Sequence, residues 1–253
     1  MSINPLIKLA IKANSPTDKA QILADKLKLS LETETVKADL LMGWQDDKLA
    51  LFLPNSGAVF IDFISGRLAH RRQYGGGKNQ PLARAIGLSS KKIPHVIDAT
   101  AGMGRDSFVL ASLGCHVQML ERSPIIAELL ADALFRASQD ETTTEISQRM
   151  SILCVNASDY LLNAPKVEVI YLDPMYPEKR KSAAVKKDMQ ALQLLVGKDT
   201  DSDKLLAAAL QTATTRVVVK RPKSAPCLSG IQPTSTISSP NTRYDIYSIK
   251  AIK

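Results

Sequence analysis

The alternation of strand-like and helix-like segments after about residue 90 constrains the fold more than any other feature of this sequence. Short apolar segments there predict strands, at residues 95–99, 116–120, 150–155, 168–172 and 216–220. Apolar residues at helical spacing predict helices at residues 105–113, 125–137 and within 193–214. Strands that alternate with helices favour a mostly parallel sheet covered on both faces, and residues 243–252 add a terminal strand.

The first 90 residues have a different pattern. Two short apolar runs, residues 48–53 and 58–64, are separated by Pro-Asn-Ser-Gly, which is turn chemistry typical of a β-hairpin. A basic, glycine-rich loop follows at residues 70–78. We therefore expect a small N-terminal α+β subdomain over residues 1–90 and a larger α/β domain over residues 91–253. Residues 222–241 are rich in Ser, Thr and Pro and predict a long loop or hairpin connection.

The charge of the chain bears on its partners. A formal net charge of +8 favours a polyanion, of which nucleic acid is the commonest for a soluble protein, with an anionic membrane as the alternative. The sequence has neither a secretory signal nor an apolar run of about 18 residues, so we expect a cytoplasmic protein without a membrane span. Neither the three cysteines nor the three histidines show metal-ligand spacing, so no metal site is expected.

An acid and two glycines surround the end of the first strand predicted after residue 90. Asp98 closes this strand, and Gly102 and Gly104 are expected to let a ligand approach the backbone, with the amides of the following helix start facing it. The second strand ends at Glu121, which is suitably placed to accept both ribose hydroxyl protons of a nucleoside. The pattern predicts a cofactor that contains a nucleoside.

Two classes of cofactor compete for this site. A dinucleotide fingerprint has a third small residue after the glycine pair, a place that Ser107 could take, but it requires no acid at the strand end. Asp98 four residues before Gly102 instead resembles the first motif of Rossmann-like methyltransferases, where the acid lies near the methionine amino group. By the same resemblance, Ser158 and Asp159 would lie along the adenine edge.

The segment Asp173-Pro-Met-Tyr176 directly follows the strand predicted at 168–172 and is therefore expected at the carboxyl edge of the sheet. It resembles the (Asp/Asn)-Pro-Pro-(Tyr/Phe) motif of enzymes that methylate an amino nitrogen conjugated to a planar system. The Asp173 carboxylate and the Pro174 carbonyl can accept hydrogen bonds from both N–H groups and direct the nitrogen lone pair. Tyr176 can stack on a base. Met175 departs from the motif, which has proline there.

Basic residues cluster beside these predicted strand ends. Lys179, Arg180 and Lys181 follow the Asp-Pro-Met-Tyr segment, and Arg71, Arg72 and Lys78 flank three consecutive glycines. A third cluster is Lys220, Arg221 and Lys223. Each cluster alone could be a solvated face, but their common position favours contacts with nucleic-acid phosphates.

Taken together, these segments resemble the bacterial small-subunit ribosomal RNA guanine-N2 methyltransferase J family. The resemblance spans roughly residues 60 to 250 and is carried by Phe60-Ile-Asp-Phe, Ala69-His-Arg-Arg, Gly75-Gly-Gly-Lys, the segments 98–106, 119–122 and 171–177, Lys181-Ser-Ala, Val185-Lys-Lys and the segment 217–222. It implies a Rossmann-like class I methyltransferase with a mostly parallel seven-stranded sheet, S-adenosylmethionine as cofactor, and a guanine of 16S rRNA or the small ribosomal subunit as substrate. The cofactor contacts that it implies are Arg105, Asp106, Glu121, Arg122, Ser158, Asp159 and Asp173.

Three alternatives remain open from the residues alone. The same chemistry could act on DNA adenine or on a protein glutamine. A non-catalytic RNA-binding Rossmann module is disfavoured by the intact segment from Asp173 to Tyr176. A nicotinamide oxidoreductase is disfavoured by Asp98.

Overall fold

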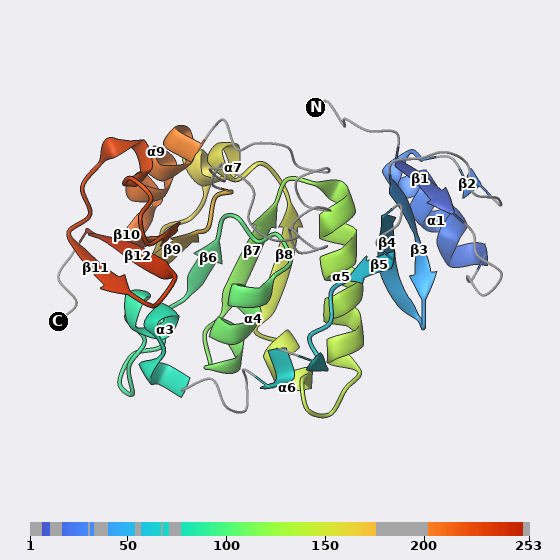
Figure 1. Cartoon of the computed structure of the whole chain (residues 1–253), viewed down its shortest axis with the longest axis horizontal. Coiled ribbons are helices and arrows are strands. Elements are labelled where there is room, and N and C mark those ends of the chain that lie inside the picture. Colours follow the sequence, from blue (N-terminus) through green and yellow to red (C-terminus); the bar gives the residue numbers. More distant parts are fainter. Residues whose placement is uncertain are drawn as a thin grey trace.

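The computed structural model describes residues 7–10, 17–29, 31–32, 40–53, 57–66, 68–70, 77–175 and 202–249. These residues form one sheet of five strands and one of seven, which lie at opposite sides of the long helix α5 (Figure 1). None of the described helices is long and apolar enough to cross a membrane.

The five-stranded sheet belongs to the N-terminal part of the chain. Its strands are β1 (Ile7–Ala10), β2 (Leu31–Glu32), β3 (Leu40–Gln45), β4 (Lys48–Leu53) and β5 (Gly57–Phe60). Their order is β2-β1-β3-β4-β5, and α1 (Thr17–Leu27) connects β1 to β2. The predicted hairpin is confirmed, because β4 pairs antiparallel with β5 and Ala50 faces Phe60.

The seven-stranded sheet is the predicted mostly parallel one. Its strands are β6 (Val96–Asp98), β7 (Val117–Glu121), β8 (Met150–Cys154), β9 (Val167–Leu172), β10 (Ala213–Pro222), β11 (Ser235–Ser238) and β12 (Thr242–Ser248). The order is β11-β12-β10-β9-β6-β7-β8. The five strands from β6 to β10 run parallel, whereas β12 and β11 are antiparallel to their neighbours. The last hairpin distinguishes this sheet from the all-parallel order 3-2-1-4-5-6 of dinucleotide-binding folds.

Helices cover both faces of this sheet. One face packs against α3 (Pro81–Ala85), α4 (Arg105–Ser112), α5 (Pro124–Ser138) and α6 (Thr144–Ser147), and the other against α7 (Ala157–Asn163) and α9 (Ser202–Thr212). Strand alternation divides β10 between the two cores, since Val218 packs on the α4 side and Val217 and Val219 pack on the α9 side. Residues of opposite parity on a strand therefore reach different layers.

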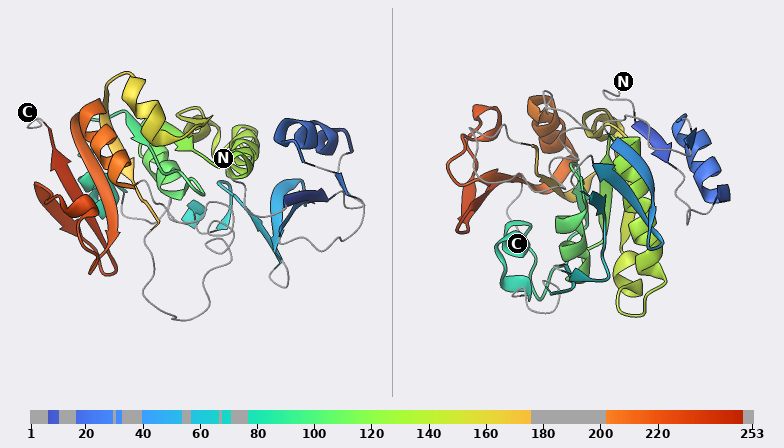
Figure 2. Two further views of the ribbon diagram at one scale, coloured as in Figure 1. Left: turned by 90° about the horizontal axis from the view of Figure 1, so that it is seen from above. Right: turned by 45° about the vertical axis from the view of Figure 1, so that its right-hand side comes forward.

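The N-terminal sheet packs against α5, as Figure 2 shows from above. The backbone N–H of Leu49 donates to Asp132 Oδ2 at 3.2 Å, and Arg136 Nη2 donates to the carbonyl of Ile61 at 2.5 Å. The Asp132 and Arg136 side chains both belong to α5. Buried residues of the two parts also belong to one continuous apolar core. Packing and hydrogen bonds thus hold the N-terminal sheet beside the larger one.

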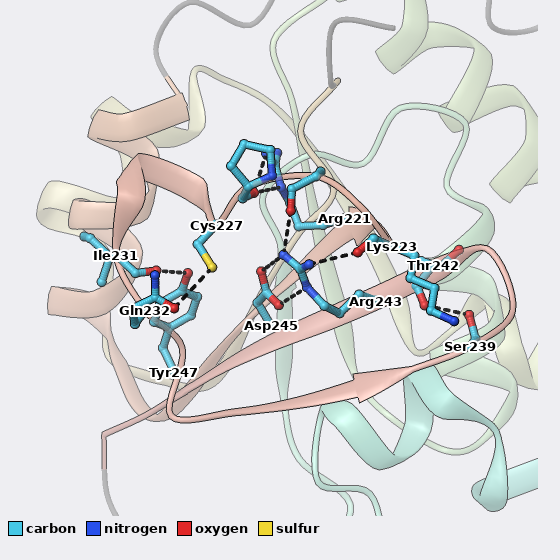
Figure 3. A network of polar contacts seen from close by, with 12 residues as sticks. Arg221, Lys223, Cys227, Ile231, Gln232, Ser239, Thr242, Arg243, Asp245 and Tyr247 are labelled. Carbon is cyan, nitrogen blue, oxygen red and sulfur yellow. Dashed lines mark hydrogen bonds and ion pairs between the residues drawn. The ribbon is translucent and has the colours of Figure 1, made fainter. Parts of the chain in front are cut away.

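The connection after β10 is more ordered than a long loop. It contains the short 3-10 helix η2 (Leu228–Gly230) and then β11. Arg243 on β12 forms a two-point ion pair with Asp245, at 2.6 and 2.9 Å, and also donates to the carbonyl of Ala225 (Figure 3). Arg221 donates through Nε and Nη2 to the carbonyl of Pro226. The predicted hairpin connection is therefore present, fastened by two arginines.

Candidate active site

The strand order reverses next to β6. This strand has β7 on one side and β9 on the other, so the chain winds outward in two directions from the same place. In open parallel sheets, ligands bind outside the carboxyl ends of the strands at such a reversal. Asp98 ends β6, and Asp173 follows β9. Thr100 Oγ1 accepts a hydrogen bond from the Asp173 backbone N–H at 2.6 Å, which joins the two strand ends.

Glu121 holds the glycine turn after β6. Its Oε2 accepts a hydrogen bond from the Gly102 N–H at 3.0 Å, and its Oε1 accepts one from the Ser123 N–H at 2.8 Å. The residue is only 6% exposed, so the carboxylate is fixed at the end of β7. The predicted contact of Glu121 with ribose hydroxyls stays a prediction.

Asp98 lies beneath the same turn and is 2% exposed. Its Oδ1 accepts from the Thr100 N–H at 3.1 Å, and its Oδ2 accepts from Ser107 Oγ at 2.5 Å. Burial raises the pKa of this carboxyl group to about 7, against the opposing effect of these two hydrogen bonds, and the nearby Asp106 and Asp173 add to the rise. Asp98 therefore ties the turn to the start of α4. A contact with a methionine amino group remains a prediction.

Gly104 lies against the protein interior. It forms the N-cap of α4 with a φ of +66°, a conformation that side chains disfavour. A Cβ atom here would lie 2.7 Å from Leu130 Cδ2 and 3.1 Å from Phe63 Cζ. Phe63 itself stacks on Phe108 with ring centroids 4.9 Å apart. The sequence suggested ligand approach as the reason for this glycine, and the structure supplies core packing as another.

The other predicted cofactor residues lie at the same edge of the sheet. Arg105 and Asp106 occupy the first turn of α4, and Arg122 follows β7. Ser158 and Asp159 start α7 just after β8, where the Asn156 side chain accepts hydrogen bonds from both of their backbone N–H groups. The structure thus brings together residues from three successive strand ends, as the sequence predicted.

Lys220 joins two carboxylates at this edge. Its Nζ lies 2.7 Å from Asp173 Oδ2 and 2.8 Å from Asp106 Oδ2. Tyr171 on β9 donates its hydroxyl to the same Asp106 oxygen at 2.7 Å. The prediction that Lys220 and Arg221 contact phosphates is therefore wrong: Lys220 is engaged by the carboxylates, and Arg221 is 5% exposed and bound to a carbonyl.

The electrostatics of this cluster follow from burial and opposite charge. Burial raises the pKa of Asp173, an effect that Asp106 reinforces and Lys220 opposes. Burial would lower the pKa of Lys220, but the two carboxylates outweigh it and raise that pKa well above its usual range. The pKa of Tyr171 is raised by burial and by Asp106, so its phenol stays neutral and donates. Lys220 is accordingly a permanent cation between two acids.

Some predicted site residues lie outside the described residues: Tyr176, Lys179, Arg180, Lys181, Arg71 and Arg72. Pro174 is buried directly after Asp173. Lys78 is exposed on the short 3-10 helix η1 (Gly77–Asn79), with its Nζ 3.5 Å from the carbonyl oxygen of Ser89. In the part of the chain that the structure describes, no three His, Cys, Asp or Glu side chains are grouped to hold a metal ion.

The strand order, the glycine turn after β6 and the acids after β6, β7 and β9 define a Rossmann-like class I methyltransferase. A family model of SAM-dependent methyltransferases matches residues 22–249. A ribosomal RNA small subunit methyltransferase J of Hydrogenovibrio crunogenus is 58% identical, over 93% of this chain and 92% of the relative. The chain belongs to this methyltransferase J family, and its methyl donor is S-adenosylmethionine.

Two further relatives cover nearly the whole chain. The protein of the same name from Chromobacterium violaceum is 46% identical over 93% of both chains. The crystal structure of a SAM-dependent methyltransferase of Neisseria gonorrhoeae superposes with a TM-score of 0.77 at 32% identity, covering 98% of this chain and 97% of that one. The nicotinamide oxidoreductase that the glycine turn left open is therefore excluded.

Proposed function

We propose that this protein methylates the exocyclic N2 of a guanosine in 16S rRNA of the small ribosomal subunit, in the bacterial cytoplasm. The names of its relatives support a small-subunit rRNA substrate. The resemblance of Asp173-Pro-Met-Tyr176 to amino-methyltransferase motifs supports an exocyclic nitrogen as the acceptor. The observation that carries the proposal is the position of Asp173, which follows β9 at the strand reversal and is held there by Thr100.

Asp173 and Pro174 would prepare the acceptor nitrogen. The lone pair of an exocyclic amino group is delocalised into the base, which makes the group a poor nucleophile. The Asp173 carboxylate and the Pro174 carbonyl can each accept one N–H, which favours a tetrahedral nitrogen with its lone pair directed at the methyl carbon. Proline restricts the backbone that carries this carbonyl. Tyr176 would stack on the base, which contributes about 1 to 3 kcal/mol in single-strand binders.

When bound, S-adenosylmethionine would supply a methyl group from a cationic sulfur, which would keep the electrons of the broken carbon–sulfur bond and leave as a neutral thioether. The acceptor nitrogen uses its lone pair for the new bond and then loses one proton to solvent. Because the donor is already activated, most of the acceleration would come from positioning. Asp106, Glu121, Ser158 and Asp159 are the residues that would hold the nucleoside and methionine parts of the donor.

Nucleoside analysis of rRNA tests this function. In 16S rRNA from cells without the gene, one N2-methylguanosine should be missing, and the intact gene should restore it. Purified protein should then methylate that rRNA, either naked or in the assembled subunit. If 16S rRNA is unchanged while N6-methyladenine in DNA or methylglutamine in protein is lost, the substrate is one of the alternatives. No methylation of any of the three would contradict the proposal.

We also assign the N-terminal part, residues 1–90, to RNA contact, together with Lys179, Arg180 and Lys181. Replacing Arg71, Arg72 and Lys78 with Ala should weaken RNA binding at low salt without changing cofactor affinity. Since each phosphate contact contributes about 0.7 to the slope of log affinity against log salt for single-stranded RNA, the slope should fall by about 2.

Fluorescence titrations at several salt concentrations would measure that slope. The matched control changes Lys166 and Lys204 to Ala, since both are exposed lysines outside the residues assigned to RNA contact. The control should have a smaller effect on the slope. An unchanged slope in the triple variant would assign these residues to an ordinary solvated face.

A further inference from the structure

We infer that Lys220 is a positioning residue for methyl transfer: it holds Asp173 as an oriented carboxylate, so that the second oxygen of Asp173 can accept the target N–H. The inference rests on the proposed function of Asp173. It gives a role to a lysine whose neighbours in the sequence suggested a phosphate contact.

The contacts of Asp173 leave one oxygen for a substrate. The backbone N–H is held by Thr100, and Oδ2 is held by Lys220 at 2.7 Å. Within the described residues, Oδ1 accepts no hydrogen bond, and the side chain keeps 40% of its surface exposed. The Lys220 side chain is 27% exposed and contacts Asp106 on its other side. Asp173 is thus fixed at its backbone by Thr100 and at one carboxylate oxygen by Lys220, which leaves the other carboxylate oxygen for a substrate.

The fold dictates this pairing. Strands β10 and β9 are parallel neighbours, with Val219 opposite Leu172 as their last pair. One residue further along each strand lie Lys220 and Asp173. Lys220 is two residues after Val218 on the same strand, so both face the α4 side of the sheet. Asp106 lies on α4. Register and parity together direct the ammonium group to both carboxylates.

The groups around Asp173 show why a neighbouring cation is needed to keep this side chain ionised. Among the described residues, its titratable and charged neighbours are Asp98 on β6, Asp106 on α4, Tyr171 on β9, and Lys220 and Arg221 on β10. Burial and Asp106 both raise the pKa of Asp173, whereas Lys220 is the strongest opposing influence and Arg221 a weaker one. A protonated carboxyl group would donate from one oxygen and could no longer accept as a carboxylate. Without Lys220, Asp173 would therefore be neutral over a wider pH range.

The pH dependence of the rate separates this role from a structural one. Because the reaction needs ionised Asp173, activity is lost as the pH falls through the pKa of that group. Lys220→Met removes the cation and raises this pKa, so the loss of activity at low pH should set in at a higher pH than in the wild type. Turnover at the low end of the pH range should fall about tenfold relative to the wild type, and the difference should shrink as the pH rises. Lys220→Arg keeps the charge, so its rate should decline over the same low-pH range as that of the wild type (the acid limb of the pH–rate profile). Its maximal rate should be lower.

The measurement is the single-turnover rate at saturating rRNA and S-adenosylmethionine between about pH 5.5 and 8.5, with cofactor affinity by calorimetry and thermal unfolding for each variant. Lys204→Met, which removes the same charge from an exposed position on α9, is the control and should leave the acid limb in place. A Lys220→Met protein that is slowed equally at every pH, or that keeps the wild-type limb, would overturn the inference.

A double substitution provides a second test. If Lys220 acts through Asp173, Lys220→Met should cost little further activity in an Asp173→Asn protein. An additional independent loss in that background would also overturn the inference. Near-normal turnover of Asp173→Asn alone would instead contradict the proposed role of Asp173, so the two failures can be told apart.

Discussion

Replacing Asp173 with Ala is expected to leave a folded protein that binds S-adenosylmethionine but methylates rRNA at least about 100-fold more slowly. The loss has this size because a positioned polar group that acts in the transition state is removed. Cofactor affinity should weaken only modestly, since Glu121 and the turn that it holds are unchanged. Single-turnover rates and calorimetry would measure the two effects separately.

The matched control for this variant is Asp203→Ala. Asp203 is an exposed aspartate at the start of α9 whose carboxylate accepts a hydrogen bond from Ser229. This control should methylate at the normal rate. If the Asp173→Ala protein retained near-normal turnover, the Asp-Pro-Met-Tyr segment would be only a turn, and the mechanism would have to be abandoned.

The second large effect is expected on stability. Gly104→Ala should lower the free energy of unfolding by about 2 to 5 kcal/mol, because overpacking costs about 1 to 3 kcal/mol and a left-handed backbone about 1 to 2 kcal/mol. The new Cβ atom would lie 2.7 Å from Leu130 Cδ2, and Phe63 closes the other side. Urea unfolding of the wild type and the variant would measure the difference.

Gly66→Ala separates the two causes. Gly66 has nearly the same φ, +68°, but no atom of the described residues lies within 4 Å of the position that a Cβ would take. Its cost should therefore be the backbone part alone, about 1 to 2 kcal/mol. Equal losses in the two variants would show that Leu130 and Phe63 move aside without cost, and that packing does not require Gly104.

The strands of the larger sheet could be predicted from the sequence because most of them are short, apolar and bounded by turn residues. All six strands predicted for this sheet are present, and their observed ends differ from the predicted ends by a few residues. The strands β1, β2 and β3 were not predicted. β2 has only two residues, and so short a strand is fixed by its neighbours and carries no periodicity of its own.

The candidate site could be predicted in part. Glycines and acids in order along the chain were enough to place Asp98, Glu121 and Asp173 at adjacent strand ends. The direction of a side chain on β10 was not predictable, because it depends on the register with β9 and on which face each residue occupies. Lys220 and Arg221 are adjacent in the sequence but have unrelated surroundings, one between carboxylates and the other on the carbonyl of Pro226.

The strand order of the larger sheet also describes how it can be assembled as the ribosome makes the chain. β7 pairs with β6, β8 with β7, β9 with β6 and β10 with β9, so each of these strands emerges when its neighbour already exists. β11 is the exception, since it pairs with β12, which follows it. The two strand ends that meet at the proposed active site can therefore pair before β10 is translated, and only the final hairpin must wait for the end of synthesis.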